Sequence, residues 1–203
     1  MCVSQYITPL IGLVTGTLIG VFAEPIRTWI YRPVLKASFK KIDSCVTRTP
    51  IGTGSDLREG FYIRAKVENR RWQMAKSCRA YLVKVEQKNS KGDFGPTIFA
   101  DSLPLNWSNQ RREDNGRPID LPFGVSQFVD VISTDQGAPG IPVVPPTYTV
   151  HAAMPFRYGV LFDNGPKILR LTILVTGDGV KAATTKIVFD WRKHWEKFEV
   201  SEG

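Results

Sequence analysis

The sequence has few of the side chains that catalytic and metal sites use most often. It contains three cysteines and two histidines among 203 residues. The cysteines are odd in number and have no C-x-x-C spacing, which favours neither a zinc site nor a disulfide framework. A G-x-S-x-G elbow, a P-loop and a G-x-G-x-x-G turn are also missing from the sequence. We therefore predict no enzyme activity, no catalytic residue, no metal site and no cofactor.

Charge is missing from one long stretch near the N-terminus. Residues 6–23, YITPLIGLVTGTLIGVFA, contain no charged side chain. As an α-helix they would reach about 27 Å, close to the roughly 30 Å hydrocarbon core of a bilayer. Lipid cannot hydrogen-bond a backbone, so a spanning segment must be helical. We predict one transmembrane helix over residues 6–23, after a short tail of residues 1–5.

The residues that follow indicate a membrane interface and an orientation. The apolar stretch ends at Glu24, and residues 24–33 form a predicted juxtamembrane segment. Residues 1–23 contain no lysine or arginine, whereas residues 24–41 contain five. By the positive-inside rule, the N-terminus is outside and the C-terminal domain is cytoplasmic. The predicted interfacial residues are aromatic and basic, as is typical at lipid headgroups: Arg27, Trp29, Tyr31 and Arg32.

Two alternatives to a membrane anchor stay open. A signal peptide cleaved after Ala23 would make the protein a secreted domain, and Cys45 and Cys78 could then form a disulfide. The basic n-region of a signal peptide is missing, however, and the apolar stretch is longer than a usual h-region. The second alternative is a buried helix of a soluble protein, since three threonines and three glycines make residues 6–23 only modestly apolar.

Three glycines of this stretch recur every four residues, at Gly12, Gly16 and Gly20. They would lie along one face of a helix, where small residues let two helices approach closely. We predict that this face packs against a second copy of the chain or against another membrane protein. Membrane lipid is the other predicted partner of the helix.

From residue 34 onward, short alternating segments separated by turn residues indicate an all-β domain over residues 34–200. Residues 61–67 alternate apolar and polar side chains, as do residues 169–176, which is typical of half-buried strands. We expect seven to nine strands in an antiparallel, immunoglobulin-like β-sandwich. Loops are expected at residues 40–59, 109–117 and 137–146. The expected strands and shorter segments are residues 34–39, 61–67, 75–87, 97–100, 103–107, 119–122, 127–133, 169–176 and 185–191.

Part of this domain resembles a known group of modules. Residues 65–69 (AKVEN), Ala75 and residues 78–82 (CRAYL) resemble the strand-turn-strand unit of immunoglobulin-like, CARDB-like modules of bacteria. The layout is similar to that of small bacterial membrane-anchored proteins, with an R-P-x-L boundary at residues 32–35. The pattern departs at Arg71, where the group has glycine. The resemblance implies a β-sandwich fold with a binding or scaffolding role and no chemistry.

We predict that the domain binds a protein partner through the loops at residues 101–122 and 137–160 or through an exposed strand edge. The alternative is binding of nucleic acid or anionic lipid, since basic and aromatic side chains together can grip phosphate and stack on bases. A membrane tether disfavours nucleic acid. The candidate residues for that alternative are Arg70, Arg71, Trp72, Arg192, Lys193 and Trp195.

Overall fold

The computed structural model describes residues 23–27, 30–41, 44–52, 57–108, 110, 114, 116–137, 147–152, 154–163 and 165–203. Residues 23–27 and 30–31 are helical, and most other described residues belong to strands. The described strands and the 3-10 helix η3 are, in chain order, β1 (Leu35–Ser38), β2 (Val46–Ile51), β3 (Arg58–Asn69), β4 (Ala75–Lys88), β5 (Phe94–Pro96), β6 (Leu103–Trp107), β7 (Ile119–Leu121), β8 (Ser126–Asp135), β9 (Thr147–Val150), η3 (Phe156–Phe162), β10 (Lys167–Asp178), β11 (Ala183–Trp191) and β12 (Phe198–Glu202).

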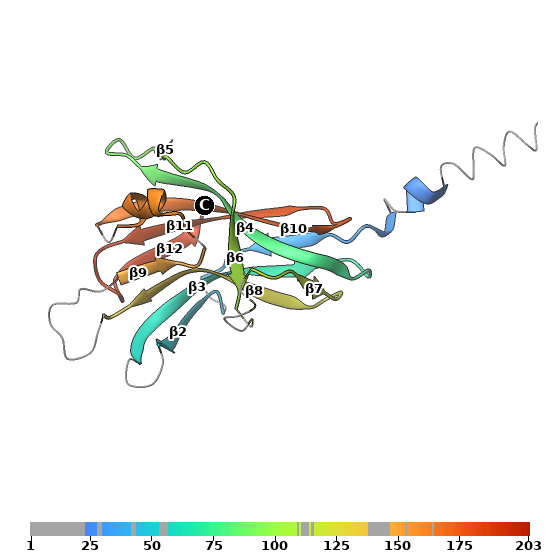
Figure 1. The fold of residues 1–203 in the computed structure, drawn as a ribbon, viewed down its shortest axis with the longest axis horizontal. Helices are drawn as coiled ribbons and strands as arrows, with labels where there is room; N and C mark the ends of the chain where they lie inside the picture. Colours follow the sequence, from blue (N-terminus) through green and yellow to red (C-terminus); the bar gives the residue numbers. More distant parts are fainter. Residues whose placement is uncertain are drawn as a thin grey trace, which may run out of the picture.

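All neighbouring strands pair antiparallel in one sheet, ordered β1-β3-β8-β6-β4-β10-β11-β12. The sheet folds back on itself at β6, whose first half pairs with β4 and whose second half pairs with β8. Two layers result, with β3 and β8 in one and β4, β10 and β11 in the other (Figure 1). The all-β, antiparallel part of the prediction is therefore confirmed.

Between the layers lies a core built from alternate residues of the long strands. Leu169, Leu171, Ile173 and Val175 of β10 are fully buried, as their alternation predicts. They belong to one cluster with the inward side chains of β3, β4, β8 and β11. Because a side chain on a strand points to one face or the other, this alternation fixes which face of each strand is buried.

The domain has two ends. The proximal end contains the turns at residues 70–74, 122–125 and 179–182, and the segment before β1 leaves the domain there (Figure 1). At the distal end lie β5, η3 and the turn at residues 192–197. Along β10, Lys167 pairs with Trp191 at the distal end and Asp178 pairs with Lys76 at the proximal end. The eleven residue-to-residue steps from Lys167 to Asp178 separate the ends by roughly 35 Å.

Some boundaries differ from the expected ones. There are twelve strands among the described residues, more than the seven to nine expected. Strand β2 lies inside the expected loop at residues 40–59, where it pairs only with β3. Its Pro50 is compatible with such an edge strand, because the missing N–H is not needed on the open side. The short strand expected at residues 97–100 is instead β5, at Phe94–Pro96.

Several predictions fall outside the described residues. They are the tail at residues 1–5, the transmembrane helix up to residue 22 with Gly12, Gly16 and Gly20, the interfacial Trp29, and most of the loops expected at residues 109–117 and 137–146. Within the part of the chain that is described, no helix has both the length and the apolar character needed to cross a membrane.

Candidate functional site

The two loops predicted to bind a partner, at residues 101–122 and 137–160, meet at the distal end. Arg157 of η3 forms an ion pair with Asp101, which also accepts a hydrogen bond of 2.7 Å from the Tyr158 hydroxyl. The same hydroxyl accepts a 3.3 Å hydrogen bond from the Ala100 backbone N–H. These contacts hold the Asp101 carboxylate in its charged form and lower its pKa. Residues more than fifty positions apart are therefore fixed side by side.

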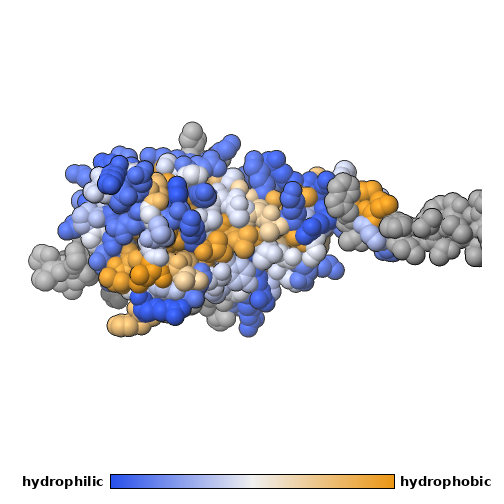
Figure 2. Space-filling view, turned by 90° about the horizontal axis from the view of Figure 1, so that it is seen from above, coloured by the Kyte–Doolittle hydropathy of each residue, from blue (hydrophilic) through white to orange (hydrophobic). Residues whose placement is uncertain are grey.

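This junction carries an exposed apolar surface. Phe156 is 101% exposed, Val160 is 66% exposed and Ile98 is 60% exposed. We name these three residues the distal surface. Hydrophobic side chains gather at the end of the molecule remote from the N-terminal segment (Figure 2).

The helix beneath the distal surface is firmly held. Its Tyr158 and Leu161 are buried in the core, and the Tyr158 ring packs on Phe99 at 4.9 Å between centroids. Lys167 of β10 donates a 3.2 Å hydrogen bond to the Leu161 carbonyl. Tyr148 of β9 donates one of 3.1 Å to the Asp163 carbonyl. The exposed side chains therefore project from a fixed backbone.

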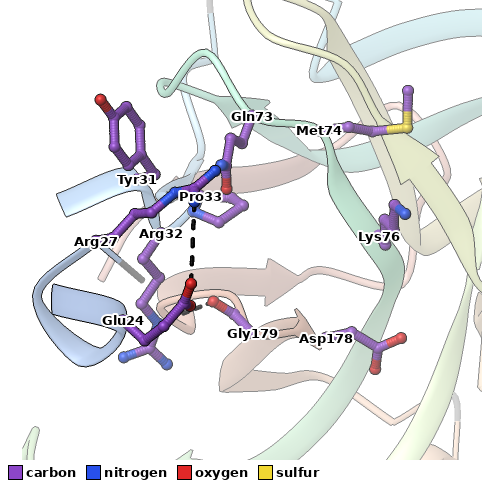
Figure 3. A pocket seen from close by; sticks show the side chains of 10 residues that line it. All are labelled: Glu24, Arg27, Tyr31, Arg32, Pro33, Gln73, Met74, Lys76, Asp178 and Gly179. Atoms are coloured by element: carbon purple, nitrogen blue, oxygen red, sulfur yellow. Dashed lines mark hydrogen bonds and ion pairs between the residues drawn. The ribbon is translucent and has the colours of Figure 1, made fainter. Parts of the chain in front are cut away.

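At the proximal end, two of the predicted interfacial and basic residues fasten the N-terminal segment to the domain. Arg32 donates from Nε to the Gly179 carbonyl at 3.0 Å and from Nη2 to the Val180 carbonyl at 2.8 Å. Arg71 donates to the Ile30 carbonyl at 2.7 Å. A pocket of about 290 Å³ lies between this segment and the strand ends, where Arg32 reaches the turn at Gly179 (Figure 3).

The other interfacial residues that the structure describes are exposed. Tyr31 is 53% exposed, and Arg27 lies 3.9 Å from Glu24 in an ion pair at the surface. A pair of this kind at the surface contributes little to stability. Both residues line the same proximal pocket.

The turn after β3 holds the most exposed of the tryptophans that the structure describes. Trp72 is 85% exposed and stacks on Phe123 of the neighbouring turn, with 5.1 Å between ring centroids. Arg70 forms a 3.6 Å ion pair with Glu68. Among the described non-glycine residues only Ser77 and Lys193 have positive φ, so the turn does not need the glycine that the CARDB-like group has at Arg71.

The structure separates the six basic and aromatic candidates into two groups at opposite ends. Arg70, Arg71 and Trp72 lie at the proximal end, and Arg192, Lys193 and Trp195 lie in the distal turn before β12. In the distal group, Arg192 forms ion pairs with Asp190 and Glu199. Trp195 packs on Phe61 at 5.8 Å and lies under the guanidinium of Arg48 at 5.4 Å. Trp195 therefore has a packing role.

The two cysteines that the structure describes are buried, and His151 is half-buried. Cys45 and Cys78 are both unpaired, and burial raises the pKa of the Cys78 thiol to about 11. Burial lowers the pKa of His151, whose ring stacks on Tyr62 at 5.3 Å. In the described ranges, no three histidine, cysteine or acidic side chains gather as metal ligands would.

Sequence reasoning missed Phe123 and Phe156. Neither belongs to an alternating pattern, and an isolated phenylalanine in a loop gives no sign of whether it is buried. Phe156 does follow Pro155 in the loop at residues 137–160, and that loop was expected to bind a partner. No protein-family model matches this chain, and no curated protein matches it either. The resemblance to the CARDB-like group therefore stays a prediction.

Proposed function

We propose that this protein is a single-pass membrane protein whose cytoplasmic β-domain binds a protein partner through the distal surface. The observation that carries the proposal is the complete exposure of Phe156 on helix η3, whose Tyr158 and Leu161 are buried. Val160 of the same helix is also exposed, as is Ile98, the residue before the Phe99 that packs on Tyr158. Exposed apolar groups that are fixed in place bind at low entropic cost, and aromatic anchors dominate many protein interfaces.

An immunoglobulin-like β-sandwich is the fold we propose for the domain. The antiparallel pairing, the two layers and the single core between them support it. Sandwiches of this kind commonly present binding residues in the loops at one end. The distal surface lies on such connections, between β5 and β6 and between β9 and β10.

The membrane anchor in this proposal is residues 6–23, supported by their uncharged composition. The orientation is supported by the five basic residues that follow within residues 24–41. Because the segment before β1 leaves the domain at the proximal end, the distal surface lies on the side of the domain turned away from the membrane. Binding of nucleic acid is less well supported, because the basic and aromatic candidates divide between two ends instead of forming a continuous strip.

A photocrosslinking amino acid at position 156 tests partner binding in intact cells. We expect one discrete protein adduct there, and none from the same probe at Lys186, which is exposed on the outer face of β11. The adduct should disappear when Val160→Glu places a charge in the distal surface. Adducts that form equally at both positions, or that survive Val160→Glu, would contradict the proposal.

A membrane-impermeant thiol reagent tests the orientation independently of the partner. In intact cells we expect labelling of Cys2, and no labelling of a Lys91→Cys variant at the exposed turn after β4. Labelling of position 91 without cell lysis would show that the domain is outside, as in the reversed or secreted alternatives.

A further inference from the structure

We infer that the proximal end is a second binding surface, which docks onto the anionic headgroups of the membrane that holds the anchor. The exposed Trp72–Phe123 pair would enter the interface. We name this pair, together with Met74 and Val125, the proximal surface. This inference rests on the proposed membrane anchor and adds a fixed orientation of the domain on the bilayer.

The four apolar side chains of the proximal surface are exposed to solvent and are not buried in the core. In addition to the Trp72–Phe123 stack, Met74 is 46% exposed and Val125 is 38% exposed. All four side chains come from the two neighbouring turns at residues 70–74 and 122–125. Tryptophan is enriched in membrane-interface belts, and Trp72 lies at a tip of the domain beside an arginine.

Asn69 holds the two turns together from inside. It is fully buried, and its side-chain amide donates hydrogen bonds to the Gln73 carbonyl at 2.6 Å and the Leu121 carbonyl at 3.0 Å. Its side-chain oxygen accepts one of 3.1 Å from the Arg71 N–H. Its backbone carbonyl accepts one of 3.0 Å from Gly124. The exposed rings are therefore presented by a preorganised support.

The anchor joins the domain at this same end. The Ile30 carbonyl is bound by Arg71, the residue before Trp72. Ala23, the last residue of the predicted anchor, is seven residues before Ile30. Even a fully extended chain of that length spans at most about 25 Å. A membrane entered at Ala23 is therefore within reach of the proximal surface, and this identifies the bilayer as its occupant.

Positive charge on the same side complements anionic lipid. The guanidinium groups of Arg32 and Arg71 bind carbonyl groups and are therefore not neutralised by those contacts. A pocket of about 160 Å³ also opens on the outer face of β1 and β3. At the proximal end, the first residue of β1 pairs with the last residue of β3. Four of the residues lining this pocket are cationic and one is a carboxylate: Lys36, Lys40, Lys66, Arg70 and Glu68. Clusters of basic side chains attract the phosphate headgroups of a cytoplasmic leaflet.

Fluorescence quenching by lipid bromines tests the docking on the full chain in nanodiscs containing brominated phosphatidylcholine and phosphatidylglycerol. The chain has five tryptophans. If Trp29 and Trp72 both lie at the interface, roughly 40% of the emission is quenched. Trp72→Phe should lower this share to roughly 25%, whereas the distal control Trp195→Phe should raise it to roughly 50%.

The outcomes separate the docking from the anchor. A quenched share of roughly 20% in the wild-type chain that rises to roughly 25% in Trp72→Phe would mean that Trp29 alone lies at the interface, and it would overturn the docking and leave the anchor in place. Absence of quenching in every variant, with the chain released from the discs, would overturn both. Replacing phosphatidylglycerol with neutral lipid should reduce the fall in the quenched share of emission that Trp72→Phe causes. No reduction would overturn the role of the basic residues.

Discussion

Asn69 allows the sharpest test of how the proximal end is held together. Asn69→Ala removes three hydrogen bonds and leaves the buried carbonyl of Leu121 without its side-chain donor. At about 1 kcal/mol for each bond, with a further cost for an unsatisfied buried group, we expect a loss of about 2–4 kcal/mol. This is a large share of the 5–15 kcal/mol that typically stabilises a domain.

The assay is urea unfolding of the full chain in detergent micelles, followed by tryptophan fluorescence. With a slope of about 2 kcal/mol per molar urea, the midpoint should fall by about 1–2 M. Asn89→Ala is the matched control, because the Asn89 side chain accepts two turn hydrogen bonds but is exposed. Its expected cost is about 1 kcal/mol or less. A difference below about 0.5 kcal/mol between the two variants would refute the buried-network reasoning.

Three further predictions concern the core and its charges. In Gly60→Ala the new Cβ would lie 2.1 Å from the Thr134 carbonyl oxygen, so we expect a loss of about 2 kcal/mol or more in urea unfolding. Gly95→Ala, which has nothing within 4 Å, should change stability by less than about 0.5 kcal/mol. The Cys78 thiol is fully buried and has a pKa of about 11, so a thiol reagent at pH 8 should label it only after unfolding; rapid labelling of the folded chain would contradict this. Hydrogen bonds from Arg170 and Lys84 lower the pKa of Glu86 to about 2, so its contribution is complete above about pH 5 and is lost as the pH falls towards 2. Urea unfolding at pH 7 and pH 3 should therefore show a smaller pH effect in Glu86→Gln than in the wild-type chain, and an equal effect would argue against this role.

Much of the fold could be predicted from local patterns. The alternation in residues 61–67 and 169–176 correctly placed the buried faces of β3 and β10. A period of two is a property of the strand itself and needs no knowledge of its neighbours. Strand β2 was missed because its polar side chains alternate weakly and it contains proline. Its place at the edge, which makes proline tolerable, depends on the strand order.

The candidate sites were predictable only in part. Arg71 and Trp72 stood out as a basic and aromatic cluster, but their grouping with Arg192 and Trp195 did not anticipate that the two ends lie roughly 35 Å apart. The stacking of Trp72 on Phe123 joins residues 51 positions apart. No local rule relates two such turns.

By itself, the sequence determined the all-β class, the buried faces of the long strands and the uncharged character of residues 6–23. These follow from short-range periodicity and composition. Only the tertiary structure decided which turns share an end, that Asp101 meets Arg157, and that Trp72 and Phe156 are exposed at opposite ends. Exposure depends on what the rest of the chain covers. What the chain covers is set by the order of the strands and by the place, at β6, where the sheet folds back on itself.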